Sequence, residues 1–219
     1  DNHGAVLPGY ASGFAAEDPY GNPLETQTVP VAAQRWPWRL ASYLGNDMAA
    51  LYSDGTRLAP TMGQDEDYSE ALYEVSAYPA FGLNSLFVGG DENYGGFNDV
   101  FRDTFGSFYV ERLSCVRHPE KLTVFVSTRS NTGEPGSGTT EISEGYFRAL
   151  PPAWTIDLWA ETYLEDDPAS AGNLSLRHDN GAITVGVDGG VTTRELKTLR
   201  DMRLWSDKAT TAQWRLTPR

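Results

Sequence analysis

The sequence predicts a single α+β domain built on an antiparallel β-sheet, with short helices and long loops. At 219 residues, of which 40% are hydrophobic and 12% aromatic, the chain is long and apolar enough to bury a core. Its 22 glycines and 13 prolines are spread along the chain, which indicates many turns between short elements. We find no internal repeat and no linker that separates two compositions, so we expect one domain over residues 1–219.

The first part of the chain is expected to pass from an extended segment into a helix. Residues 1–34 contain four prolines and several glycines, which predict an extended surface segment with room for one strand. From Trp38 to Leu51 apolar residues recur at three- and four-residue steps, which predicts a helix interrupted near Gly45-Asn46. Residues 53–70 are polar and are expected to form turns.

The middle of the chain is expected to alternate strands and loops. Residues 73–88 contain strand-like pieces, and apolar residues alternate with small or polar ones from Phe81 to Phe87. The glycine-rich, acidic stretch 89–96 predicts a loop, and residues 97–112 have room for a short helix. Leu122 to Ser127 reads as the clearest buried strand.

Loops are also expected in the next part of the chain. Residues 130–140, SNTGEPGSGTT, carry the strongest loop signal. Residues 145–159 are rich in aromatic side chains around Pro151-Pro152, which predicts an irregular segment packed over the sheet. Residues 165–168, Glu-Asp-Asp-Pro, are expected to form an acidic surface turn.

A β-hairpin is predicted near the C-terminus. Ala182 to Val187 is a short β-branched run, and Val191 to Arg194 can return as its partner strand. The turn between them, Asp188-Gly189-Gly190, contains residues that tolerate positive φ. We expect Asp188 to bond the turn's backbone and His178 to donate a hydrogen bond that fixes the hairpin. Glu195 to Trp205 then has helical apolar spacing.

Charge and cysteine content exclude some classes of function. The chain has 17 basic and 30 acidic residues, a net charge of −13, so a phosphate backbone would be repelled and nucleic-acid binding is not expected. An acidic surface favours solubility and attracts cations. Cys115 is the single cysteine and cannot form an intramolecular disulfide; we interpret it as a buried, inert thiol.

Catalytic motifs are missing from the sequence, and we predict that the chain is not an enzyme. The three histidines, His3, His118 and His178, do not have the spacing of a zinc site. Gly136-Ser137-Gly138 does not match a nucleophile elbow, and no phosphate-binding or dinucleotide fingerprint is present. An acid pair of the glycosidase type remains an alternative, but no pair stands out in the sequence.

Calcium is the most plausible ligand, although we expect no resident cofactor. Asp65 and Asp67 lie in one acidic stretch, and Asp91 followed by Asp99 in another. Both stretches supply the hard oxygen donors that calcium prefers, but neither has the spacing of an EF-hand. We interpret these four aspartates as candidate metal ligands.

Four stretches of the chain together resemble one protein family. His178 and Asp188-Gly189 have the spacing of the H-X9-DG region of prepilin-like proteins, relatives of type II secretion pseudopilins found in planctomycetes. Residues 35–44, 78–85 and 116–122 resemble further elements of that family, in the same order. The resemblance covers most of residues 30–209, so we divide the chain into an N-terminal segment, 1–34, and a family-like core, 35–209.

The resemblance implies a pilin-like fold and a structural role. Members of such families act as subunits of extracellular or envelope-associated filaments, either pili or secretion pseudopili, by self-assembly with copies of themselves or with related subunits. Some pseudopilins bind calcium in a loop near the sheet. The implied location is the cell envelope, the cell surface or the extracellular space.

The chain departs from the family at its start. Prepilin-like proteins begin with a basic leader and a long apolar helix that anchors them in the membrane and later packs in the filament core. Residues 1–10 resemble the segment that follows this helix. The apolar runs here fall short of the roughly 20 residues that cross a bilayer, so we expect the chain as given to be soluble. Either the native protein carries the apolar helix ahead of these residues, or it is a relative that has dispensed with it, and membrane contact is expected only through such a helix. A head-to-tail filament without that helix needs other contacts, and residues 1–34 adding to a neighbour's sheet edge is one hypothesis.

A monomeric cell-surface module that binds carbohydrate or protein is the alternative function. Trp36 and Trp38 flank Pro37, and four more tryptophans follow late in the chain. Aromatic side chains with a polar group suit interfaces and sugar stacking as well as cores. We expect most of these tryptophans to be buried or half-buried.

Overall fold

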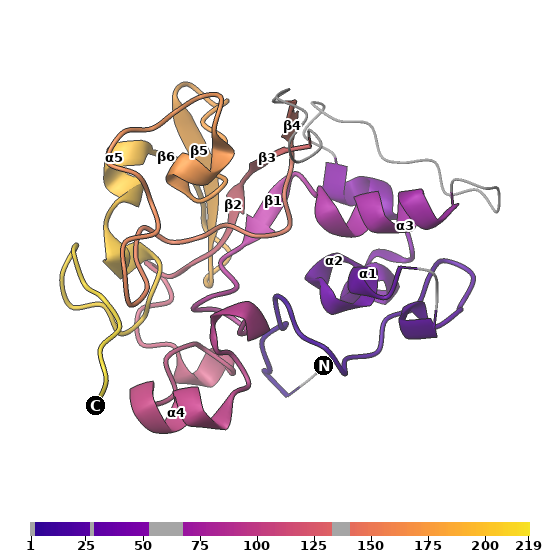
Figure 1. Cartoon of the computed structure of the whole chain (residues 1–219), viewed down its shortest axis with the longest axis horizontal. Coiled ribbons are helices and arrows are strands. Elements are labelled where there is room, and N and C mark those ends of the chain that lie inside the picture. The colour runs from indigo at the N-terminus through magenta and orange to yellow at the C-terminus, as the bar shows by residue number, and fades with distance from the viewer. Residues whose placement is uncertain (1–2, 27–28, 53–67, 133–140) are drawn as a thin grey trace.

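The computed structural model describes residues 3–26, 29–52, 68–132 and 141–219, and within these ranges the fold is α+β, as predicted (Figure 1). A four-stranded antiparallel sheet has the order β1-β2-β5-β6, and a two-stranded sheet pairs β3 with β4. The strands of the larger sheet are β1 (Phe81–Leu83), β2 (Thr123–Ser127), β5 (Gly181–Gly186) and β6 (Val191–Glu195). The smaller sheet is formed by β3 (Arg129–Asn131) and β4 (Ile142–Glu144).

The helices are short and gather mainly on one side of the sheet. Figure 1 shows α1, α2 and α3 together on one side of the molecule, and the β5–β6 hairpin with the C-terminal segment on the other. The α-helices are α1 (Val31–Gln34), α2 (Trp36–Arg39), α3 (Tyr68–Ala77), α4 (Asp99–Phe105) and α5 (Leu196–Leu199). Single 3₁₀ turns lie at Leu24–Thr26, Ala41–Leu44, Met48–Tyr52, Glu92–Tyr94, Leu113–Cys115, Pro168–Ala171 and Met202–Leu204. Among the described residues, no helix is long and apolar enough to span a membrane.

The interruption predicted near Gly45-Asn46 is confirmed, but the helix expected from Trp38 to Leu51 is wrong in its type. The chain forms α2 and then two separate 3₁₀ turns over this range. The second turn begins after Gly45 and Asn46, which both adopt left-handed φ values of +62° and +64°. Because a left-handed residue ends a helix, the apolar spacing continues while the helical hydrogen bonding does not.

The strand-like pieces expected within residues 73–88 are confirmed only at β1, because residues 73–77 lie in helix α3. The helix starts at Tyr68, so it also replaces the last of the expected turn residues. Ala71, Leu72 and Val75 are buried, which is the one-sided spacing of a helix. Strand structure begins only at Phe81, two residues after Pro79, which disfavours continuation of a helix.

The C-terminal hairpin is confirmed. Strands β5 and β6 pair antiparallel from Gly181 opposite Glu195 to Val185 opposite Val191. Gly189 has φ +80°, and the Asp188 carboxylate accepts a hydrogen bond of 2.9 Å from the backbone N–H of Gly190. The single helix expected after the hairpin is divided into α5 and a 3₁₀ turn, because the chain bends at Asp201, which caps the second turn.

The N-terminal segment is largely irregular before α1, as expected of an extended segment, and part of it packs against the rest of the fold. Ala5 bridges to Arg112 and Tyr10 to Arg35, while Ala11 and Leu24 are buried. Its backbone also donates and accepts hydrogen bonds across the fold, as in the 2.9 Å bond from Val6 N–H to the Glu111 carbonyl. The described part of the segment is therefore tied to its own chain, which counts against the hypothesis that it adds to a neighbour's sheet edge.

The core lies on both sides of the larger sheet. The most extensive cluster joins the sheet to the C-terminal segment through large side chains that include Phe87, Trp159 and Trp205. A second cluster around Trp38 and Leu72 holds the N-terminal helices together. Four tryptophans are buried and two, Trp154 and Trp214, are half-buried, which confirms that most serve the core.

Most loop predictions are also confirmed. Residues 97–112 contain the short helix α4, and the predicted strand 122–127 is β2. Residues 145–159 are irregular, and residues 165–167 form an exposed turn. Of the stretch 130–140, Ser130 and Asn131 belong to β3, Thr132 follows the strand, and residues 133–140 lie outside the described residues.

Cys115 is exposed, so the prediction of a buried thiol is wrong. The residue ends the 3₁₀ turn Leu113–Cys115, in which no residue is buried. Because the neighbouring side chains are exposed as well, the local sequence has no apolar stripe to bury the thiol.

We expect a maleimide reagent to label Cys115 to completion in the folded protein, because no side chain has to move to admit it. Mass spectrometry without denaturant measures the modified fraction. Labelling that begins only in denaturant would contradict the exposed position.

Candidate functional site

An apolar row crosses all four strands of the larger sheet. Leu83 pairs with Phe125, Phe125 with Val185, and Val185 with Val191. Residues that pair directly in antiparallel strands share one face of the sheet, so these four side chains form a continuous line. Leu83 is 1% exposed, Phe125 and Val185 are half-buried, and Val191 is 67% exposed. The sheet thus presents a face that its own chain covers only at one end.

A groove follows this row. It is a hollow of about 330 Å³ between the sheet and the N-terminal segment at Val6 and Leu7. Its lining is almost wholly apolar: Ala5, Val6, Leu7, Leu40, Leu83, Val88, Val110, Leu113, Val124, Phe125, Val185, Gly186, Val187 and Gly189. We call this the apolar groove. Concave, mostly apolar surface is a common setting for a binding site, so the apolar groove is the candidate site in this structure.

A second hollow adjoins the apolar groove across the N-terminal segment. It measures about 870 Å³ and shares Leu7, Leu40 and Leu113 with the apolar groove. Exposed Tyr43 lines its far side. Leu113 is 53% exposed and lines both hollows, so it marks the point where a partner could contact both.

Close backbone packing holds the N-terminal segment beside the sheet. Gly89 has φ +79°, and a Cβ at this position would lie 1.9 Å from the carbonyl oxygen of Leu7. The guanidinium of Arg39 donates to the backbone carbonyls of Pro8, at 2.8 Å, and of Ala11 and Gln34. Burial lowers the pKa of Arg39 to about 10, so it remains charged at neutral pH. These contacts fix one wall of the apolar groove.

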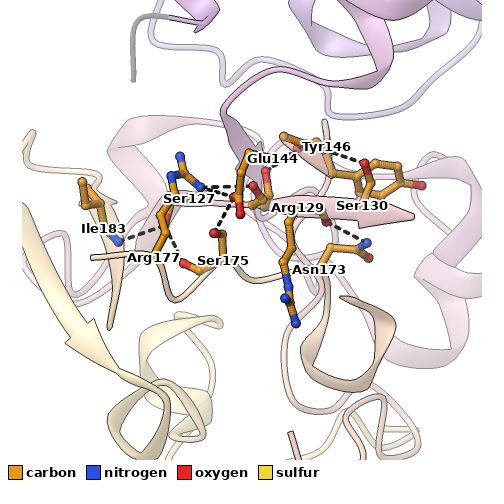
Figure 2. Close-up of polar contacts among 11 residues, drawn as sticks. Ser127, Arg129, Ser130, Glu144, Tyr146, Asn173, Ser175, Arg177 and Ile183 are labelled. Atoms are coloured by element: carbon orange, nitrogen blue, oxygen red, sulfur yellow. Dashed lines mark hydrogen bonds and ion pairs between the residues drawn. The ribbon is translucent and has the colours of Figure 1, made fainter. Parts of the chain in front are cut away.

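A polar network ties the two sheets together beneath the hairpin. Figure 2 shows Glu144, Ser175 and Arg177 pointing toward one another. The Ser175 hydroxyl donates to Glu144 at 2.5 Å, and Arg177 donates to the same carboxylate at 2.7 Å. Nearby, Ser127 donates to the Ser175 carbonyl and accepts from the Ile183 N–H, both at 3.0 Å. Each bond joins one strand to the segment beside it, so we assign the network a structural role.

Of the predictions for the H-X9-DG residues, the turn at Asp188-Gly189 is confirmed and the side-chain hydrogen bond of His178 is not. Asp188 and Gly189 form the expected turn. The expected side-chain bond from His178 does not form in the described residues: its Nε2 is buried without a hydrogen-bond partner. The backbone of His178 instead exchanges two hydrogen bonds with Gly181 at the start of β5. The motif therefore marks the start of β5, through the backbone of His178, and the turn that connects β5 to β6, through Asp188 and Gly189.

The candidate calcium ligands are not brought together in the described structure. Asp65 and Asp67 lie outside the described residues. Asp99 is exposed in the first turn of α4, where a carboxylate favours the helix N-terminus. Asp91 is buried and bound to protein groups. Across the described ranges, no group of three or more His, Cys, Asp or Glu side chains is placed to hold a metal ion.

Asp91 forms a buried ion pair that the sequence did not reveal. Its carboxylate lies 2.8 Å from the Nε of Arg148 and accepts a 2.6 Å hydrogen bond from the Ser85 hydroxyl. The guanidinium of Arg148 also lies over the rings of Tyr10 and Tyr94. Burial raises the pKa of Asp91, and Arg148 limits the rise. The expected metal ligand is thus a packing residue that anchors the loop after Gly90.

Comparisons of the chain with protein-family models, with curated proteins and with solved structures find no match. The site therefore has to be interpreted from its own geometry. Its dominant feature is the apolar groove, which suits binding of an apolar segment.

Proposed function

We propose that the chain forms the globular part of a structural subunit of an extracellular or envelope-associated filament, a pilus or secretion pseudopilus, that acts by self-assembly. The observation that carries the proposal is the apolar row Leu83, Phe125, Val185 and Val191, which borders the apolar groove. A helix packs an apolar stripe against a sheet face, so the groove suits an apolar helix of a pilin-like subunit. The family resemblance implies a helix of that kind.

Assembly would be head-to-tail. A contact between two different surfaces that does not close into a ring repeats into a filament. The apolar groove supplies one of these surfaces. The N-terminal segment supplies its wall and stays in its own subunit, because it is held there by backbone hydrogen bonds such as Val6 to Glu111.

The carbohydrate-binding alternative has less support from the geometry. Sugar stacking needs an open aromatic face. The Trp154 ring is stacked on Phe101 with 5.6 Å between centroids and 7° between planes, and Tyr94 meets it edge-on. Its ring is therefore engaged within the protein, and the same holds for the four buried tryptophans.

A Leu113→Glu variant is expected to lose self-association, because it places a charge at the rim shared by both hollows. Sedimentation velocity over a range of concentrations, with electron microscopy of the fastest species, measures the effect. The wild type should form larger species as concentration rises, while Leu113→Glu stays monomeric. Leu113 is exposed, so the variant should fold normally.

Ile156→Glu is the matched control, because Ile156 is 62% exposed and lies outside the groove lining. Equal association of the two variants would count against the groove as the contact. A second test of the proposal is the intact mass of the polypeptide purified from its native cells. A mass that exceeds 24.1 kDa by the mass of an apolar helix would support a pilin-like subunit. A native chain that starts at Asp1 would count against this proposal.

A further inference from the structure

A positively charged hollow lies away from the apolar groove. It measures about 320 Å³ and lies between residues 117–122, which precede β2, and residues 203–210, which follow α5. Four cationic side chains and one carboxylate line it; the cations are Arg117, Lys121, Arg203 and Lys208. The whole chain has a net charge of −13 and only three lysines, two of which are here. Such local reversal of the charge of an acidic protein indicates a site for an anion.

The walls of this basic hollow are joined by Asp207. Its carboxylate accepts hydrogen bonds from the backbone N–H groups of Arg117 and His118, at 3.0 and 2.9 Å. The backbone of Lys208 donates to the Ser206 hydroxyl at 3.3 Å, and Ser206 is buried. The Asp207 side chain therefore links the two walls, and the cationic side chains stand on a backbone that is held in place. Asp207 keeps its negative charge, so the hollow carries a net positive charge after its contribution is counted.

Positive charge exceeds negative charge in this hollow, where four cationic side chains stand against the lining carboxylate of Asp207 and the neighbouring Asp201. Arg203 is paired with Asp201 at 2.6 Å. No carboxylate of the described residues forms a salt bridge with Arg117, Lys121 or Lys208. Burial, and then the neighbouring cations Arg219 and Arg117, lower the pKa of Lys208, while the Asp207 carboxylate opposes this shift.

We propose that the basic hollow binds a tetrahedral oxyanion, phosphate or sulfate. Arg117 offers a planar fork of donors that matches such an oxyanion, and Lys121 and Lys208 supply point charges beside it. The same group can be a free ion or an ester on a polyanionic saccharide, and the chemistry of recognition is shared. This binding activity goes beyond the proposed assembly role and uses a different surface.

Isothermal titration calorimetry with sodium phosphate and sodium sulfate tests the site at low ionic strength, where screening is weak. The wild type should bind with a saturable, single-site isotherm. Arg117→Gln should weaken binding by about tenfold, the loss expected of one charge-assisted hydrogen bond. An unchanged melting temperature will show that this exposed substitution leaves the fold intact.

Lys197→Gln is the matched control, because it removes one positive charge from an exposed site on α5 outside the hollow. Its affinity should stay within about twofold of the wild type, since Lys197 lies outside the hollow and loses no direct hydrogen bond to the anion. No saturable binding by the wild type, or equal losses in the two variants, would overturn the proposal. A sulfated hexasaccharide then identifies the source: tighter binding than inorganic sulfate indicates an ester on a polymer, and equal binding indicates the free ion.

Discussion

An Asp91→Ala variant is expected to lose about 3–5 kcal/mol of free energy of unfolding, because it leaves a buried guanidinium without its counter-charge. The side chain of Asp91 is 0% exposed and that of its partner Arg148 is 10% exposed. The Ser85 hydroxyl loses its acceptor in the same variant. Denaturation in urea, followed by tryptophan fluorescence, measures the loss.

Two further variants separate the ion pair from other roles of Asp91. Asp99→Ala removes a carboxylate from an exposed position in the first turn of α4, so it should cost only about 0.3–1 kcal/mol. The double variant Asp91→Ala, Arg148→Met should be more stable than Asp91→Ala, since no buried charge is left alone. A loss below about 1 kcal/mol for Asp91→Ala would show that solvent reaches Arg148, contrary to the burial in the structure.

The ion pair also shows why the sequence misassigned this aspartate. An acidic, glycine-rich stretch has the composition of a cation-binding loop, and composition carries no information about partners. Asp91 and Arg148 are 57 residues apart in the chain, and only the fold brings them together. The sequence shows how many carboxylates a loop contains. Only the fold shows whether a metal ion or an arginine neutralises them.

Local signals predicted the elements whose structure is decided locally. The hairpin from Ala182 to Arg194 and the strand from Leu122 to Ser127 depend on β-branched residues and turn residues within a few positions. The break near Gly45-Asn46 was also predicted from local residues, but the apolar spacing from Trp38 to Leu51 did not show that most of this range forms 3₁₀ turns and not an α-helix. The prediction that Cys115 is buried was wrong. It relied on how often cysteines are buried on average, whereas this cysteine lies in an exposed turn.

The apolar row could be predicted only in part. Alternation within β2 and β5 indicates which side chains share a face of each strand. Which residue of one strand lies opposite which residue of another depends on register, and a shift of one residue would move the row to the other face. The pairing of Phe125 with Val185 also follows an irregularity next to Thr123, which no local pattern specifies. The central feature of the candidate site is thus a property of the assembled sheet.

A Gly89→Ala variant is expected to lose at least about 2 kcal/mol of free energy of unfolding, because two costs act together. A non-glycine residue in the left-handed region costs about 1–3 kcal/mol, and forcing extra volume into packed structure costs about 1–3 kcal/mol more. At φ +79° the new Cβ would lie 1.9 Å from the Leu7 carbonyl oxygen and 3.2 Å from the Pro8 Cα. Because backbone cannot rotate away as a side chain can, the N-terminal segment has to move off the sheet.

Gly13→Ala isolates the contribution of the close contact. Gly13 has φ +74°, nearly the same backbone conformation, and nothing lies within 4 Å of the position of its Cβ. It should therefore show the strain alone, about 1 kcal/mol. Hydrogen exchange at the Val6 amide, which donates to the Glu111 carbonyl at 2.9 Å, should accelerate in Gly89→Ala and stay slow in Gly13→Ala. Equal exchange in both variants would mean that the wall of the apolar groove is not held at Gly89, and a groove without a fixed wall could not present the apolar row as a defined surface for another subunit.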